Sequence, residues 1–309
     1  MEEMMEVMRR AFMAYSSGRA DAPQRTVVSV PERHGVVLVK PGRVEGRALG
    51  AKLVSIFPDN PRIGLPTTMG IVILLDPATG EPLAVCDGTF LTAWRTAATS
   101  GLATDLLARP DARNAAVLGA GAQARAQVLA IDAVRDLDKI RIFAPTAEHV
   151  DELVESLQPF TNATLISSGS ADTAVSQADI VCAVTTSDKP VFGAFSLKDG
   201  THINGVGSFR PSMKEIDSDV VRRAKIFVDS RQGCSHEAGE LIDAIEQGWT
   251  SPNDWTEIGE VALGARSGRE TEHELTFFKT VGIAVQDVEA AAAALIRCEQ
   301  LGLGEMVEL

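Results

Sequence analysis

The chain has 309 residues, with 42 acidic and 29 basic side chains, a formal net charge of −13 and 45% hydrophobic residues. Nucleic-acid partners attract clustered lysines and arginines, so this acidic balance argues against them. The longest apolar runs, Ile71–Leu75 and Ala290–Ile296, are far shorter than the roughly 20 residues that span a bilayer. We therefore expect a cytoplasmic protein of about two domains, with no membrane or nucleic-acid partner.

The first hundred residues predict a helix and then several strands. Met4, Met8, Phe12 and Tyr15 recur at helical spacing and form one apolar stripe over about residues 1–17. The predicted strands cover residues 25–30, 35–39, 50–56 and 69–75. They are separated by proline and glycine turns such as Pro41-Gly42, and a helix over 89–107 follows. Strands joined by short turns favour an antiparallel or mixed sheet, so an α+β domain is predicted here.

From about residue 111 the pattern changes to apolar strands that alternate with helices. The predicted strands cover 114–118, 139–143, 164–167, 179–184, 202–206 and 225–228, with helices at 123–134, 147–157 and 170–177. This alternation is typical of a doubly wound parallel sheet, so the fold class is α/β. A last helix is predicted at about 288–301. We assign residues 111–285 to the parallel-sheet domain, and 1–110 with 286–309 to the α+β domain.

A glycine-rich turn links the strand at 114–118 to the helix after it. It reads Gly119-Ala120-Gly121-Ala122-Gln123-Ala124. Gly119 permits the tight turn, Gly121 lets the backbone approach a pyrophosphate, and Ala124 allows close packing of helix on strand. The start of the helix offers unpaired N–H groups to the phosphates. The sequence therefore predicts a Rossmann dinucleotide site that uses Gly119, Gly121, Ala122 and Gln123.

The choice between NAD(H) and NADP(H) depends on the end of the second strand of this domain. An NAD-preferring fold usually places Asp or Glu there, to hold the ribose 2′-hydroxyl. This chain reads Phe143-Ala144-Pro145-Thr146, with neither a carboxylate to repel a 2′-phosphate nor an arginine to bind one. Thr146 offers a hydrogen bond to such a phosphate. We therefore favour NADP(H) slightly over NAD(H).

Three cations stand in apolar or strand-like segments of the first hundred residues: Arg25, Lys52 and Arg95. Taken singly, each fits a half-exposed residue whose stem covers the core. Three such side chains facing one pocket would need an anionic ligand, because buried charge must be paired. Arginine binds a carboxylate with two parallel hydrogen bonds, so a small carboxylate is the expected ligand.

Several segments resemble the ornithine cyclodeaminase/mu-crystallin family. They are GLPT at 64–67, LTAWRTAATS at 91–100, the GAGAQA turn, THINGVGSFRPSMKEID at 201–217 and TFFKTVGIAVQD at 276–287. The resemblance covers nearly the whole chain. It implies a Rossmann domain joined to a substrate-binding domain that also forms a homodimer. It further implies an oxidoreductase or cyclodeaminase that acts on α-amino or α-imino acids.

The resemblance also assigns roles to residues of this chain. Arg25, Lys52 and Arg95 match the positions that hold the substrate carboxylate in the family. The positions that line the dinucleotide correspond to Thr67, Arg95, Gly121, Ala122, Thr185, Gly207, Ser208 and Val281.

Two departures separate this chain from the cyclodeaminases of the family. A carboxylate that serves proton transfer in those enzymes is replaced by Phe209, and a second acidic position is occupied by Leu38 or a neighbour. Loss of ammonia requires a base, which phenylalanine cannot supply. The chain therefore resembles the ketimine reductase/mu-crystallin branch more closely.

The resemblance implies NAD(P)H-dependent reduction of a small cyclic α-imino acid, Δ1-pyrroline-2-carboxylate or Δ1-piperideine-2-carboxylate, to the cyclic amino acid. Lys52 is the expected proton donor, because neighbouring arginine charges should lower its pKa, and an ordered water is the other candidate. The alternative enzymes are an alanine-type amino acid dehydrogenase and an ornithine cyclodeaminase. An alternative of another class is a non-catalytic, crystallin-like NADP(H)-binding protein.

The remaining polar motifs predict no further site. His236 has too few neighbouring ligands for a metal ion, and the four cysteines form no CxxC pair, so no metal is expected. Glu237, Glu240 and Asp243 predict a solvated helix face. His202, on a strand that enters the cofactor crevice, is expected to have a structural role.

Overall fold

A computed structural model describes residues 1–307 of the chain. It divides into two compact units. Unit 1 comprises Met1–Arg9 and Thr96–Gly282, and unit 2 comprises Arg10–Arg95 and Ile283–Leu309. Two of the boundaries fall inside helices α1 (Glu2–Ser16) and α2 (Gly88–Leu107), and the third falls between Gly282 and Ile283, in no helix. Within residues 1–307, no helix is both long and apolar enough to cross a membrane.

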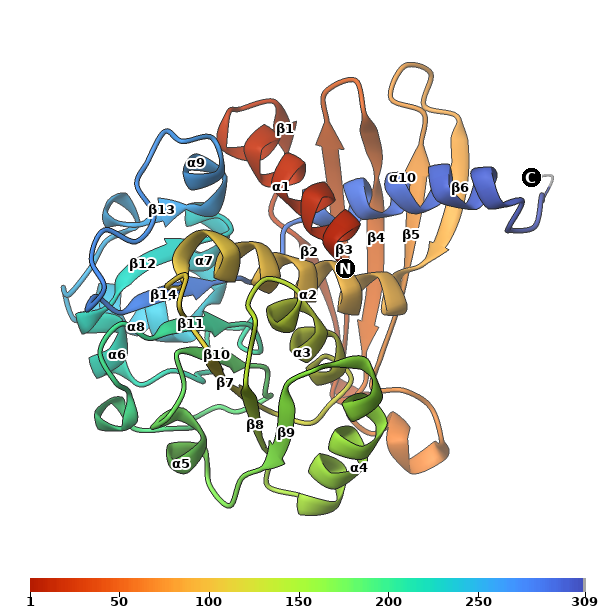
Figure 1. The fold of residues 1–309 in the computed structure, drawn as a ribbon. Coiled ribbons are helices and arrows are strands. Elements are labelled where there is room, and N and C mark those ends of the chain that lie inside the picture. Colours follow the sequence, from red (N-terminus) through yellow and green to blue (C-terminus); the bar gives the residue numbers. More distant parts are fainter. Residues whose placement is uncertain (308–309) are drawn as a thin grey trace. The chain divides into compact units, whose positions relative to one another are not determined.

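Unit 1 is built on an eight-stranded sheet in the order β13-β12-β14-β11-β10-β7-β8-β9. Every strand pair in it is parallel. The strands are β7 (Asn114–Leu118), β8 (Lys139–Phe143), β9 (Thr164–Ser167), β10 (Ile180–Ala183), β11 (His202–Gly205), β12 (Lys225–Val228), β13 (Thr256–Glu257) and β14 (Thr276–Lys279). The chain reverses its direction of winding between β7 and β10 (Figure 1). This is the switch point of a doubly wound sheet, outside which ligands bind.

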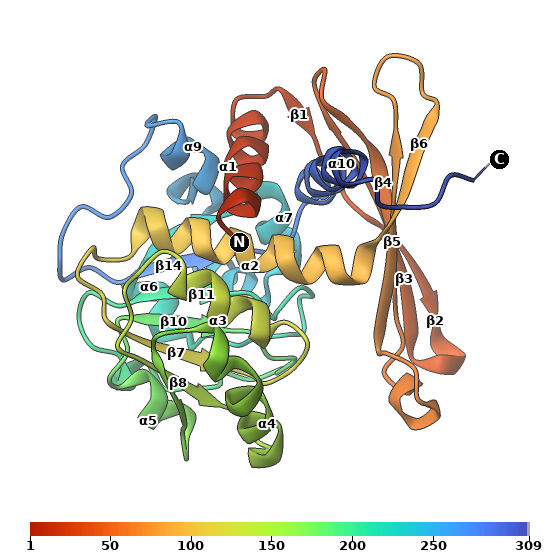
Figure 2. The ribbon, with the colours of Figure 1, turned by 45° about the vertical axis from the view of Figure 1, so that its right-hand side comes forward.

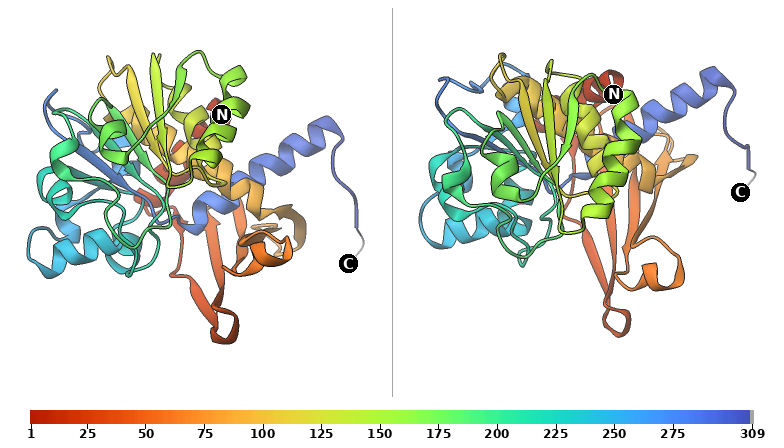
Figure 3. Two further views of the ribbon diagram at one scale, coloured as in Figure 1. Left: turned by 90° about the horizontal axis from the view of Figure 1, so that it is seen from below. Right: turned by 60° about the horizontal axis from the view of Figure 1, so that its bottom comes forward.

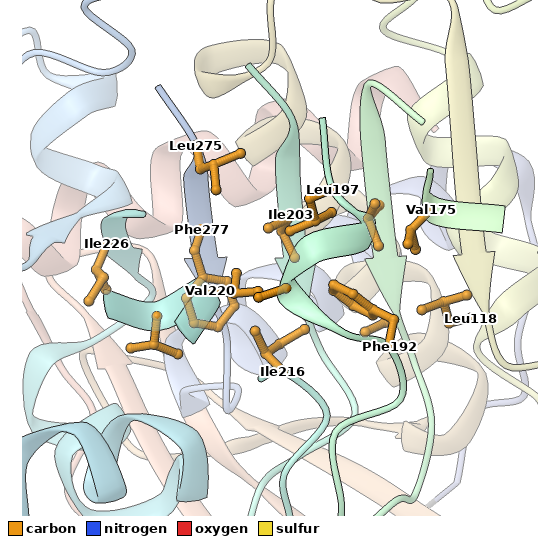
Figure 4. Packing of buried hydrophobic residues seen from close by; sticks show 14 of the residues in the cluster. Leu118, Val175, Phe192, Leu197, Ile203, Ile216, Val220, Ile226, Leu275 and Phe277 are labelled. Atoms are coloured by element: carbon orange, nitrogen blue, oxygen red, sulfur yellow. The ribbon is translucent and has the colours of Figure 1, made fainter. Parts of the chain in front are cut away.

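Helices cover both faces of this sheet. They are α3 (Ala124–Asp132), α4 (Ala147–Leu157), α5 (Ala171–Val175), α6 (Ser218–Arg223), α7 (Arg231–Glu237), α8 (Gly239–Glu246) and α9 (Ile258–Ala262). Successive residues of a strand point to opposite faces. Val117 of β7 accordingly packs in one buried cluster with α3 and α4, and Leu118 packs in the other with α5, α6 and α8. Figure 4 shows this second cluster, in which Phe277 of β14 lies beside Val220 of α6.

Unit 2 contains an antiparallel sheet in the order β1-β3-β4-β5-β6, with β2 paired to β3. The strands are β1 (Ala20–Asp21), β2 (Thr26–Val30), β3 (Gly35–Val44), β4 (Ala48–Ile56), β5 (Thr68–Leu75) and β6 (Pro82–Asp87). Helix α10 (Ala284–Leu301) packs along one face of the sheet, beside β3, β4 and β5 (Figure 2). Figure 3, seen from below, shows the same helix in blue beside the orange strands.

The predicted fold class is confirmed, with two corrections to the elements. The expected turn at Pro41-Gly42 is wrong, because β3 continues through both residues to Val44. Among the described residues, β2 pairs with Gly35–Val39 and β1 with Arg43–Val44, so Pro41 lies where β3 needs no N–H on that edge. Gly42 gives α10 room, since a Cβ there would lie 2.8 Å from the Cβ of Ala284.

The second correction concerns elements that the sequence did not predict. Strands β1, β6, β13 and β14 and helices α6 and α9 were missed, and α10 begins at Ala284 rather than near 288. β14 is inserted between β11 and β12 in the parallel sheet. This insertion places the chain after Lys279 at the same edge as the glycine turn.

Candidate active site

The glycine turn after β7 has the geometry that a dinucleotide pyrophosphate requires. Gly119 has a φ of 119°, and a Cβ there would lie 2.8 Å from the carbonyl oxygen of Val184, so only glycine fits. A Cβ on Gly121 would meet no atom within 4 Å, so the surface above it is open. Gln123, the N-cap of α3, makes no side-chain capping bond. The Oε1 of Gln123 is buried and has no hydrogen-bond partner among the described residues. These features fit a bound phosphate at the start of α3.

The other predicted dinucleotide residues of unit 1 lie at the same edge of the sheet. Thr185 follows β10, Gly207 and Ser208 follow β11, and Val281 follows β14. The Val281 N–H donates to Asp229 at 3.0 Å. Thr146 follows β8 as the exposed N-cap of α4, and its side chain makes no capping bond.

Thr67 and Arg95, which were also predicted to line the dinucleotide, belong to unit 2. Thr67 directly precedes β5, is partly buried, and accepts a hydrogen bond from the Phe57 N–H at its carbonyl oxygen. Arg95 lies on α2 and is buried.

Unit 2 contains a buried cluster of charged side chains around Asp287, in the first turn of α10. Lys52 of β4 donates to Asp287 Oδ1 at 2.7 Å, and Arg95 of α2 donates to the same oxygen at 2.9 Å. Lys52 also donates to Thr92 Oγ1 at 3.1 Å. The Nζ of Lys40, on β3, lies 3.9 Å from Asp287 Oδ2. The residues Lys40, Lys52 and Arg95 are 5%, 2% and 4% exposed. We call these four charged residues the Asp287 cluster.

Strand register and helix packing assemble the Asp287 cluster. Lys40 and Lys52 are direct partners in the β3–β4 ladder, so both side chains leave the sheet on the same face. That face is the one α10 covers, and it receives Asp287 from the helix. A carboxylate in the first turn of a helix is also favoured by the helix dipole.

Burial and mutual charge decide the protonation of the cluster. The pKa of Lys52 is lowered to about 8, mainly by burial; Asp287 opposes this lowering, and the charges of Arg95 and Arg25 add to it. The cause we expected from the sequence, the arginine charges, is therefore secondary to burial. Burial alone would raise the pKa of Asp287, but the positive charges of its neighbours outweigh it and hold this pKa well below its usual range. Burial, followed by the charge of Lys52, lowers the pKa of Lys40 well below its usual value.

The structure brings the predicted cations together only in part. Lys52 and Arg95 share one carboxylate, so the interpretation of either residue as half-exposed is wrong. Arg25 directly precedes β2 rather than opening it and is partly buried. Its charge lowers the pKa of both Lys40 and Lys52, which places it in the electrostatic environment of the cluster.

Sequence reasoning missed the acidic centre of the cluster. Asp287 stands at the end of the segment TFFKTVGIAVQD, but sequence alone does not link it to Lys52, 235 residues away. Lys40 lies one strand before Lys52, and the wrongly predicted turn at Pro41-Gly42 hid their pairing. The signal available was physical, because buried cations of one sign need a counter-ion.

Two further polar groups in unit 1 clarify earlier expectations. His202 is fully buried between Thr276 and Asn204, and burial lowers its pKa to about 3, so it is neutral and structural. Glu240 was expected on a solvated helix face, but it is 2% exposed and paired with Lys279. Among the described residues, no group of three potential metal ligands is found.

Comparisons with known proteins agree over the full length of the chain. The ornithine cyclodeaminase/mu-crystallin family model matches residues 1–300. A Δ1-pyrroline-2-carboxylate reductase of Bacillus cereus is 38% identical, with 100% of this chain and 95% of that protein covered. The structure of the Thermococcus litoralis Δ1-pyrroline-2-carboxylate reductase, with NADH and L-proline, superposes with a TM-score of 0.95 at 36% identity, covering 99% of this chain and 95% of that one.

A second solved relative has a different named activity. An archaeal alanine dehydrogenase dimer with bound NAD superposes with a TM-score of 0.93 at 32% identity, covering 100% of this chain and 94% of that one. The family predicted from the sequence motifs is thus confirmed. The chain belongs to the ornithine cyclodeaminase/mu-crystallin family.

Proposed function

We propose that this protein is an oxidoreductase that reduces a small cyclic α-imino acid, Δ1-pyrroline-2-carboxylate or Δ1-piperideine-2-carboxylate, with a nicotinamide dinucleotide. The observation that carries the proposal is the Asp287 cluster. Lys52 and Arg95 share one internal carboxylate, and Arg25 adds a further positive charge nearby. One acid does not balance these cations, so a substrate carboxylate would bind there favourably. The similar reductases of Bacillus cereus and Thermococcus litoralis support this substrate class.

The residues of the chain divide the chemistry between them. The dinucleotide, when bound, supplies a hydride to the imine carbon. Arg25, Lys52 and Arg95 hold the carboxylate of the substrate. As hydride forms the new C–H bond, the electron pair of the C=N double bond moves to nitrogen, and Lys52 Nζ gives that nitrogen a proton. Lys52 suits this role because its pKa of about 8 keeps the ammonium protonated yet acidic at neutral pH.

The dinucleotide is assigned to the carboxyl edge of the parallel sheet. We propose that residues 111–285 bind it and that 1–110 with 286–309 bind the substrate and form the dimer. The residues proposed to hold the dinucleotide are Thr67, Arg95, Gly119, Gly121, Ala122, Gln123, Thr146, Thr185, Gly207, Ser208 and Val281. Similar solved proteins hold NADH or NAD. The turn Phe143–Thr146 has no carboxylate, which supports a slight preference for NADP(H) over NAD(H).

A substrate panel tests this function. Purified protein is given NADH or NADPH with each of the two cyclic imines, and cofactor oxidation is followed at 340 nm. We expect turnover with at least one ring, and a lower KM for NADPH than for NADH. Absence of cofactor oxidation with both rings and both cofactors would reject the substrate assignment.

The alternatives give different results in the same assay. An alanine-type dehydrogenase, favoured by the similarity to the archaeal enzyme, would consume NADH faster with pyruvate and ammonia than with either imine. A cyclodeaminase would convert L-ornithine without net cofactor consumption, a reaction that Phe209 disfavours because it supplies no base. A non-catalytic binding protein would bind the dinucleotide and turn over none of these substrates.

An apolar sheet face supports the proposed homodimer. On the face of unit 2 opposite α10, β4, β5 and β6 expose neighbouring large apolar side chains. They are Leu53, Met69, Ile71, Ile73 and Val85. A contiguous exposed apolar patch marks an interaction surface, and a second copy of the chain fits it because isologous dimers bury identical faces.

Charged substitutions on this face should dissociate the dimer. In the double variant Ile71→Lys and Ile73→Lys, burial of unpaired ammonium groups would oppose association. Light scattering after gel filtration should give a mass near 32.8 kDa for the variant and twice this for the wild type. Phe195→Lys, at an exposed position of unit 1, is the matched control and should remain dimeric. A dimeric double variant would place the interface elsewhere.

A further inference from the structure

A carboxylate that the proposed reaction does not use lies beneath the dinucleotide edge of unit 1. Glu215, on the segment between β11 and α6, is 0% exposed. Its Oε1 accepts a hydrogen bond from the Thr185 N–H, and its Oε2 accepts from the N–H groups of Gly207 and Ser208. Thr185 follows β10, whereas Gly207 and Ser208 follow β11. One side chain therefore ties together the turns that leave two adjacent strands.

The two turns approach each other closely enough to require this arrangement. A Cβ on Gly207 would lie 1.9 Å from the carbonyl oxygen of Thr185 and 2.6 Å from Glu215 Oε1. Glycine at 207 therefore allows the turns to meet, and Glu215 supplies the acceptor for their N–H groups. Without Glu215 the N–H groups of Thr185 and Ser208 would lose the acceptor that burial demands, whereas the Gly207 N–H would keep the carbonyl oxygen of Ala183 at 3.3 Å.

A second buried pair ties the same turn to β14. Lys279, the last residue of β14, lies 3.0 Å from Glu240 Oε1, and both side chains are 0% exposed. The hydroxyl of Ser208 donates to both oxygens of Glu240 at 2.8 Å and accepts from Lys279. The turn after β11 is thus held from two sides, by Glu215 and by the Lys279–Glu240 pair.

The direction of the peptide groups connects this network to ligand binding. In a trans peptide the N–H and the preceding C=O point in opposite directions. Because the N–H groups of Gly207 and Ser208 face Glu215, the carbonyls of Val206 and Gly207 face away from it. They therefore offer acceptors of fixed direction, which suit the NH₂ group of a carboxamide.

The sheet topology indicates which part of the dinucleotide meets these turns. A doubly wound sheet binds one mononucleotide in each half. The glycine turn and Thr146 belong to the half formed by β7, β8 and β9, where the adenosine ribose binds. The turns held by Glu215 belong to the half formed by β10, β11 and β14, where the nicotinamide binds.

We propose that Glu215 is a positioning residue for the nicotinamide half of the dinucleotide, acting through the turns after β10 and β11. This inference rests on the proposed function, because it takes the ligand to be a nicotinamide dinucleotide. Glu215 touches neither the substrate nor the reacting atoms in this scheme. It fixes the backbone acceptors that orient the carboxamide.

The variant Glu215→Gln tests the proposal, because its NH₂ group cannot accept from at least one of the three N–H groups. The dissociation constant of NADH, measured by fluorescence titration, should rise by about 10- to 100-fold, in line with the loss of a charged acceptor for buried donors. The dissociation constant of ADP-ribose, which lacks nicotinamide, should change less than about threefold, since the first half of the sheet is untouched. Glu152→Gln, at an exposed position of α4, is the matched control and should bind both ligands as the wild type does.

Each outcome decides the proposal. Unchanged NADH affinity in folded Glu215→Gln would overturn it, and so would an equal loss for NADH and ADP-ribose, which indicates a general structural role. If Glu215→Gln does not fold, the same two dissociation constants are measured for Glu215→Asp. Its carboxylate keeps the charge but is one methylene shorter, so a smaller selective loss of NADH affinity is expected. Failure of the proposed function is separate, because it appears as wild-type protein that binds NADH and reduces no imine.

Discussion

Replacement of Lys52 by methionine is expected to lower kcat/KM for Δ1-pyrroline-2-carboxylate by about 10²- to 10⁴-fold, the usual contribution of a positioned acid. Methionine fills a similar volume but carries neither the charge nor the transferable proton. Lys52 is 2% exposed and held between Asp287 and Thr92, so water cannot easily take its place. Steady-state assays with NADH measure the effect. Turnover near the wild-type rate would remove Lys52 from the reaction.

The pH dependence of the rate is a second test of Lys52 as the proton donor. The proton donor must be protonated, and the pKa of Lys52 is about 8. In wild-type protein, kcat/KM for imine reduction should therefore fall as pH rises through about 8, while oxidation of the amino acid should increase over the same interval. In Lys52→Met, neither the fall in imine reduction nor the rise in amino acid oxidation should appear near this pH.

Two comparison variants separate proton donation from charge. Lys40→Met removes a buried ammonium from the same cluster, but Lys40 lies 3.9 Å from Asp287 and should affect rate less. Lys52→Arg keeps the charge but does not release a proton at any accessible pH. It should restore KM more than kcat. Equal losses in Lys52→Met and Lys40→Met would indicate a purely electrostatic contribution.

The parallel-sheet half of the fold could be predicted closely from the sequence, because its signals are local. Strands such as β7, β8 and β12 are short apolar segments with polar or glycine boundaries, and their predicted ends match the structure. β14 was missed, and its place between β11 and β12 is not given by the order of strands along the chain. Local patterns carry no information on such an insertion.

The role of a site residue could be predicted from the sequence only where that role does not depend on a distant partner residue. Gly119 and Gly121 act through their own backbone geometry, which a motif specifies. Lys52 could be named as a cation, but its counter-ion Asp287 is reached only through the packing of α10 on the sheet. Glu240 illustrates the converse error, because an acidic helix position looks solvated until Lys279 is known to lie beside it.

The substitution Asp287→Asn is expected to destabilise the folded protein by about 3–5 kcal/mol, because removal of one partner leaves buried charges uncompensated. Asp287 is 1% exposed and is the acceptor shared by Lys52 and Arg95. Loss of its negative charge also removes the main influence that raises the pKa of Lys52. The fall in kcat/KM with rising pH should therefore begin at a lower pH than in the wild type. Urea denaturation and a pH–rate profile measure the two effects.

A neighbouring acid on the same helix provides the control. Glu289 is 3% exposed and accepts two hydrogen bonds from Arg47, whose side chain is 50% exposed, so water can solvate the arginine that is left and Glu289→Gln should cost less than Asp287→Asn. A double variant adds a stronger test. Removing both partners of a buried pair is less harmful than removing one, so Lys52→Met should recover part of the stability lost in Asp287→Asn. If Asp287→Asn is as stable as Glu289→Gln, or if the double variant shows simple additivity, Asp287 does not hold the cluster together.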